Sequence, residues 1–139
     1  MSQPIYINLP VKNLSQSTDF YTALGFTLNP QFSNQNASAM IFNDNLTFML
    51  LTHEFYSKFT TKHIADTHHT SAVLISLSMD SKDEVQKFAN TAKSHGGSYY
   101  MAEPNKEMGD AMFALEVEDL DGHILEPAFM DMSKFPPQS

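Results

Sequence analysis

An internal repeat is the feature that most constrains how this chain can fold. Two stretches, at about 5–52 and 72–130, follow the same order of expected elements: a strand, a short helix, a glycine and then three strands. The hairpin sequences also echo each other, since 38–42 and 45–49 correspond to 110–114 and 122–126. A period of about 70 residues is too long for a solenoid. The pattern predicts an α+β fold in which two βαβββ modules form a curled mixed sheet around a cleft.

The first module begins with a β-branched run, Ile5–Val11. Its Pro10 favours an edge position or the end of the strand, because proline cannot donate to a strand ladder. A helix is expected next, capped by Ser15 or Ser17 and ended by Gly25. Three further strands are expected at 26–28, 37–42 and 46–52. The connector at 53–71 is rich in His and Thr and is predicted to be mostly irregular, although its aromatic residues could form one helical turn.

The second module repeats this order. A strand is expected at 72–78, and a capping box at 81–84 opens a helix that Gly96 ends. The last strands are expected at 98–101, 111–117 and 123–129. The dipeptide Asp121-Gly122 is a strong hairpin signal between the final two strands.

The composition of the chain excludes several classes of function. A length of 139 residues suits a single domain spanning 1–139. Eight Lys, no Arg and sixteen acidic residues give a net charge of −8, which disfavours binding to nucleic acid. The absence of Cys excludes disulfides and thiolate metal sites. No stretch has the length of a membrane span and no targeting signal precedes the first strand, so a soluble, cytoplasmic protein is expected.

Three sequence segments carry a family resemblance. The run from Asn8 to Leu14, the helix exit Phe20-Tyr-Thr-Ala-Leu-Gly-Phe26, and the terminus Asp119-Leu-Asp-Gly-His-Ile-Leu-Glu-Pro127 resemble the glyoxalase/bleomycin-resistance/extradiol-dioxygenase (vicinal oxygen chelate) superfamily. The stretch 109–131 is most similar to members labelled predicted lactoylglutathione lyases. The resemblance covers about 5–131 and implies a cleft between paired modules that holds a small molecule.

Enzymes of this superfamily hold a divalent metal with side chains from the first and last strands of each module. In this sequence the resemblance puts those positions at Tyr6, Met49, Val73 or Leu74, and Glu126. Only Glu126 carries a good ligand, and Tyr6 is a poor second, so most expected positions are not met. A divalent metal remains a possible cofactor if Glu126 is joined by a His from elsewhere.

Glu126 is the main candidate for catalysis or binding, because a carboxylate in an apolar strand is costly unless it is paired or functional. The alternative, without a functional role, is that the side chain of Glu126 points to solvent. Tyr6 is the second candidate, as a phenol that donates a hydrogen bond to a ligand; its alternative is packing on a neighbouring strand. Apolar walls of a ligand site are expected from Met49, Leu74, Met112 and Phe113.

The leading hypothesis is therefore a metal-independent, small-molecule-binding member of this superfamily, with an uncharged or weakly polar ligand oriented by Glu126 and Tyr6. The alternative is a metal-dependent lyase, isomerase or dioxygenase that uses Glu126 and a His of the connector at 53–71. A homodimer is expected by analogy with the family.

Overall fold

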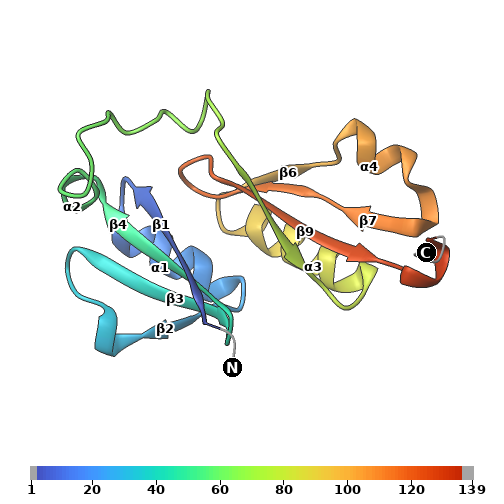
Figure 1. The fold of residues 1–139 in the computed structure, drawn as a ribbon, viewed down its shortest axis with the longest axis horizontal. Coiled ribbons are helices and arrows are strands. Elements are labelled where there is room, and N and C mark those ends of the chain that lie inside the picture. The colour runs from blue at the N-terminus through green and yellow to red at the C-terminus, as the bar shows by residue number, and fades with distance from the viewer. Residues whose placement is uncertain (1–2, 136–139) are drawn as a thin grey trace. The chain divides into compact units, whose positions relative to one another are not determined.

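The computed structural model describes residues 3–135, which form two compact units (Figure 1). The N-terminal unit ends at Thr70 and the C-terminal unit begins at Ser71. In the described part of the chain, no helix has the length and apolarity needed to cross a membrane.

The N-terminal unit is a four-stranded mixed sheet in the order β1-β4-β3-β2. Strand β1 pairs in parallel with β4, and the other pairings are antiparallel. The elements in chain order are β1 (Ile5–Val11), α1 (Leu14–Ala23), β2 (Thr27–Asn29), the 3-10 turn η1 (Pro30–Phe32), β3 (Ala37–Asn43), β4 (Leu46–Thr52) and α2 (His53–Tyr56). The edge position predicted from Pro10 is confirmed, because β1 borders the sheet.

The C-terminal unit repeats this topology with β5 parallel to β9, in the order β5-β9-β8-β6, and with β7 also on β9. Its elements are β5 (Leu74–Ser78), α3 (Lys82–Ser94), β6 (Ser98–Tyr100), α4 (Glu103–Glu107), η2 (Gly109–Ala111), β7 (Met112–Ala114), β8 (Glu116–Glu118), β9 (Ile124–Met130) and η3 (Met132–Lys134). The α+β class and the duplicated order of strands and helices are thus confirmed.

Each unit has its own core between its sheet and one helix. In the N-terminal unit Tyr21 is fully buried and makes edge-on ring contacts with Phe20, Phe26 and Phe48 at centroid distances of 5.1–5.7 Å. Such aromatic pairs add stability beyond their burial of apolar area. In the C-terminal unit the buried face of α3 presents Val85, Phe88, Ala89 and Ala92.

The start of α1 differs from the sequence prediction. The N-cap is Asn13, whose Oδ1 accepts a hydrogen bond from the amide of Gln16 at 3.0 Å, and neither Ser15 nor Ser17 takes that role. Both serines lie within the helix, which begins at Leu14, so neither occupies the cap position. Helix α3 starts as predicted, since Ser81 Oγ accepts a hydrogen bond from the amide of Glu84 at 3.1 Å.

Two strand boundaries also differ. Strand β5 begins at Leu74, two residues later than expected. The strand expected over 111–117 is split at Leu115 into β7 and β8. The amide of Leu115 donates to the carbonyl of Pro127, but Pro127 has no N–H to return the bond, so the ladder is interrupted there. The connector is mostly irregular as predicted, after the single turn of α2.

Replacing Gly96 with Ala is expected to destabilise the protein by about 1–2 kcal/mol. Gly96 follows α3 with a φ of +100°, and a Cβ built there would lie 3.0 Å from Leu120 Cδ2. Gly25 follows α1 with nearly the same φ, +103°, but a Cβ there would meet nothing within 4 Å. Urea unfolding of both variants should show the larger loss for Gly96→Ala, and equal losses would contradict the role of Leu120.

Candidate functional site

The face of the N-terminal sheet away from α1 carries two of the residues singled out by sequence. Ser38 Oγ lies 2.7 Å from Thr18 Oγ1 of α1, and Ser38 pairs with Leu50, so these two strand residues point toward the helix. Side chains alternate along a strand. Met49, the neighbour of Leu50, therefore lies on the opposite face, which we call the distal face. Tyr6 shares it, because Tyr6 pairs with Thr47, two residues before Met49.

In the C-terminal sheet Leu77 and Leu125 lie on the buried face, and the opposite face, its distal face, carries three more of these residues. Glu126 pairs with Ser76, and Leu74 lies two residues before Ser76, so Leu74 and Glu126 share a face. Met112 pairs with Met130, four residues along β9 from Glu126, and joins them. Val73 precedes β5, so of the two alternatives at that position Leu74 is the strand residue on the face of Glu126.

Phe113 lies apart from this set. It alternates with Met112 along β7 and pairs with Phe129, which places it on the opposite face, the one that carries the buried Leu125. Tyr6 and Met49 thus share the distal face of one unit, and Leu74, Glu126 and Met112 share the distal face of the other, in that order along β9.

A hairpin turn sets the register around Glu126. Asp119 Oδ1 accepts hydrogen bonds from the amides of Asp121 and His123, each at 2.9 Å. Gly122 takes a φ of +86°, a conformation that other residues rarely adopt. The turn pairs Glu118 with Ile124 and Val117 with Leu125, so the next pair along the strands is Glu116 with Glu126. The hairpin predicted from Asp121-Gly122 is confirmed.

Two glutamates therefore face each other across β8 and β9. The neighbouring pair, Leu115 with Pro127, is the hydrogen-bonded one, so Glu116 and Glu126 occupy a pair without backbone hydrogen bonds. In such pairs the Cα atoms typically lie only about 4.5 Å apart and side chains are closest. Glu116 is only 3% exposed, whereas Glu126 is half-buried.

The environment of Glu116 favours its protonated form. Burial raises its pKa, and the hydrogen bond and negative charge of Glu126 raise it further, to about 7. Hydrogen bonds from the backbone of Ala102 and from Asn105 oppose this shift. Asn105 Nδ2, on the buried side of α4, donates to Glu116 Oε2 at 3.0 Å. The carboxyl pair can thus hold a proton and present the half-buried Glu126 on the distal face.

The residues at the four implied metal positions do not fit a metal centre of the family type. Met49 and Leu74 offer no oxygen or nitrogen donor, and Tyr6 offers a phenol that is 58% exposed. Glu126 is a suitable oxygen ligand, and Glu116 beside it is a second. No group of three or more His, Asp or Glu side chains that could hold a metal occurs among residues 3–135.

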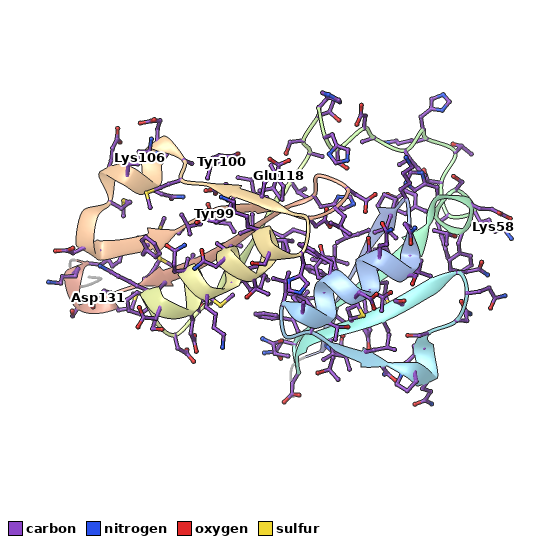
Figure 2. The ribbon with its side chains drawn as sticks, turned by 180° about the vertical axis from the view of Figure 1, so that it is seen from behind. Lys58, Tyr99, Tyr100, Lys106, Glu118 and Asp131 are labelled. Carbon is purple, nitrogen blue, oxygen red and sulfur yellow. The ribbon has the colours of Figure 1, made fainter. Side chains whose placement is uncertain are left out.

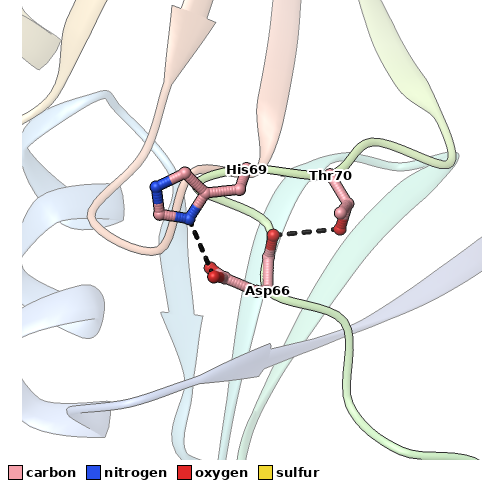
Figure 3. A network of polar contacts seen from close by, with 3 residues as sticks. All are labelled: Asp66, His69 and Thr70. Atoms are coloured by element: carbon pink, nitrogen blue, oxygen red, sulfur yellow. Dashed lines mark hydrogen bonds and ion pairs between the residues drawn. The ribbon is translucent and has the colours of Figure 1, made fainter.

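The connector histidines were the alternative source of ligands, and one of them has a local partner. Asp66 Oδ2 lies 2.8 Å from His69 Nδ1, and the carbonyl of Asp66 accepts from Thr70 Oγ1 at 2.9 Å (Figure 3). The hydrogen bond to His69 lowers the pKa of Asp66. His53, His63 and His68 are exposed. The contacts of His69 that the structure shows stay within the connector.

Sequence reasoning missed Glu116 and Asn105. Glu116 could have been found by counting outward from the Asp121-Gly122 turn, because an antiparallel register fixes which residues face each other. Asn105 gave no such signal. It lies on α4, a five-residue helix with Pro104 in its first turn and no side-chain cap, which the sequence pattern did not predict.

Comparison with known proteins identifies the family. Residues 3–126 match the model of the glyoxalase/bleomycin resistance protein/dioxygenase superfamily. A solved hypothetical protein from S. aureus is 24% identical with a TM-score of 0.72, over 93% of this chain and 94% of that one. A family enzyme from Burkholderia phytofirmans is 13% identical with a TM-score of 0.76, over 94% and 100%.

A bleomycin-binding protein, solved in complex with bleomycin, is 20% identical to this chain with a TM-score of 0.62, over 94% of this chain and 100% of that one. At these identities the likeness shows the fold alone. No curated protein matches the sequence. The family model spans most of the chain, from the first strand to Glu126, and the chain therefore belongs to the glyoxalase/bleomycin resistance protein/dioxygenase superfamily.

Proposed function

We propose that this protein binds a small, uncharged or weakly polar organic molecule and does so without the metal centre of the family's enzymes. The proposal rests on the side chains at the positions where the family's enzymes have metal ligands. Met49 and Leu74 are apolar, and Glu126 faces Glu116. These side chains suit a ligand site with an apolar wall and one polar group that orients the ligand. The bleomycin complex of a structural neighbour supports a binding role for this fold.

In this proposal Glu126 and Tyr6 orient the ligand by hydrogen bonds, and Met49, Leu74 and Met112 supply apolar walls. Phe113 was expected in the same wall, but its side chain lies on the face opposite to Met112, so this proposal does not count it among the ligand contacts. Glu116 and Asn105 fix the side chain of Glu126. A location in the cytoplasm belongs to the same proposal.

A ligand screen by thermal shift on chelator-treated full-length protein tests this function. Neutral hits are expected to raise the melting temperature of the wild type, and Leu74→Asp is expected to weaken their binding about tenfold or more, because it puts a charge on the distal face. Val73→Asp is the matched control, since Val73 is 64% exposed and Leu74 is 57% exposed. Hits that need added metal, or that respond equally to both variants, would contradict the proposal.

A homodimer is part of the proposal by analogy with the family. Sedimentation velocity across a hundredfold range of concentration is expected to show a species of twice the chain mass of 15.6 kDa. A single species of monomer mass over the whole range would contradict it.

A further inference from the structure

The N-terminal unit contains a hollow with an aromatic rim. Its volume is about 450 Å³, and it lies between β1, β4 and the turn after α2. Ligand pockets typically measure about 300–1,000 Å³. The residues that line it are Tyr6, Ile7, Asn8, Leu51, Tyr56, Phe59 and Thr60. Only Tyr6 among them was singled out from the sequence.

The aromatic rim is held in place by local structure. Thr52 Oγ1 caps α2 by accepting from the amide of Phe55 at 3.2 Å, and the amide of Phe59 donates to the carbonyl of Tyr56 at 3.0 Å. The ring of Phe55 meets that of Phe59 edge-on, with centroids 5.1 Å apart. The position of Phe59 is therefore fixed before any ligand arrives, and little ordering is required on binding.

Phe59 is nevertheless 69% exposed, and Tyr6 on the other side of the hollow is 58% exposed. Large rings that are exposed to water lack the stabilisation that burial of apolar area gives, and a bound ligand could supply it. Flat aromatic molecules suit such a site because stacked and edge-on ring contacts add to the burial of area.

The lining also selects by charge. The chain carries a net charge of −8, yet none of the seven lining residues is an Asp, Glu, Lys or His. The polar groups there are the hydroxyls of Tyr6, Tyr56 and Thr60 and the amide of Asn8. These are neutral donors and acceptors, and an ionised ligand would lose its hydration without gaining a counter-charge.

We infer that this hollow binds the planar aromatic part of an uncharged ligand, between the rings of Tyr6, Tyr56 and Phe59. The inference rests on the proposed small-molecule-binding function and adds two things to it: the ligand class, and contact residues from the start of the connector. Tyr6 belongs to both the proposed site and this hollow.

Titration of the full-length protein with 1-aminoanthracene, a neutral planar fluorophore, tests the inference. The wild type is expected to bind it saturably, and Phe59→Ala is expected to weaken binding about tenfold. Phe32→Ala is the matched control, because Phe32 is 59% exposed in the same unit but lines a different hollow, of about 200 Å³, which has Tyr6 alone in common with this one. Binding to this control is expected to stay within about twofold of the wild type.

A second variant and a second probe guard against a trivial loss of folding. Thr60→Asp keeps all three rings and adds a charge to the lining, and it too is expected to weaken binding of the neutral probe. Anthracene-2-carboxylate, the charged counterpart, is expected to bind the wild type at least about tenfold more weakly than 1-aminoanthracene. Circular dichroism checks that each variant is folded.

Equal losses in Phe59→Ala and Phe32→Ala, equal binding of the two probes, or no saturable binding would each overturn the inference. Neutral ligands that respond to Leu74→Asp but not to Phe59→Ala would overturn it while leaving the proposed function intact. If no neutral molecule binds in either experiment, the proposed function fails as well.

Discussion

Glu116→Gln is expected to stabilise the protein by roughly 2–3 kcal/mol at pH 8 and to change its stability little at pH 5. Glu116 is buried opposite Glu126, and the two carboxylates repel each other when both are ionised. Glutamine has the same shape and no charge. Its amide can donate to Glu126 while its oxygen still accepts from Asn105, so the buried contacts are kept.

The pH dependence follows from the direction of the shift. The pKa of Glu116 rises from 4.5 to about 7 in the folded protein, so between these values the folded state holds more protons than the unfolded state. Stability therefore falls as pH rises from about 4.5 to about 7 and then levels off. Glu116→Gln has no carboxyl group at this position, so it does not show the part of the stability loss that the ionisation of Glu116 causes.

Urea unfolding of the wild type and Glu116→Gln at half-unit steps from pH 5 to pH 8 measures the effect. Glu118→Gln is the control. Glu118 lies two residues along the same strand, pairs with Ile124 instead of an acid, and is labelled in Figure 2. The control is expected to keep the pH-dependent loss seen in the wild type. A flat wild-type profile over this range would contradict the described environment of Glu116.

Phe48→Ala is expected to have the largest effect on stability, a loss of about 3–5 kcal/mol. Phe48 is fully buried on β4, and its ring lies 5.7 Å from that of Tyr21 and 5.2 Å from that of Phe26. Truncation removes both contacts and leaves a cavity in the core of the N-terminal unit. Because domains are stable by only about 5–15 kcal/mol, this loss is a large share of the total.

Thermal and urea unfolding measure this loss, with Phe32→Ala as the comparison. Phe32 has the same side chain but is 59% exposed, so its truncation is expected to cost less than about 1 kcal/mol. Similar losses at the two positions would show that the aromatic cluster around Tyr21 does not form the core described.

The repeated fold could be predicted because its signals are local. Runs rich in apolar residues define β1 and β4, which begin and end where expected, and Ser81 caps its helix with its own side chain. The cap at Asn13 was missed because two serines nearby offer the same chemistry. The short helix α4 has no side-chain cap, so sequence periodicity gave no sign of it.

The candidate site was only partly predictable. Glu126 stood out as a carboxylate in an apolar strand, but its environment depends on Glu116, ten residues earlier in the chain. That contact is created by the register of β8 on β9. The aromatic hollow depends on how the turn after α2 packs beside β1, which is a tertiary contact that composition alone does not reveal.

Metal analysis of the full chain tests most directly the central claim that it binds ligands without a metal centre. The protein is purified without chelators, its metal content is measured, and its melting temperature is recorded with added Mn²⁺, Fe²⁺, Ni²⁺ and Zn²⁺. No stoichiometric ion and no rise in melting temperature are expected, because Met49 and Leu74 provide no ligands. Nearly one ion per chain, with a rise in melting temperature that Glu126→Ala abolishes, would contradict it.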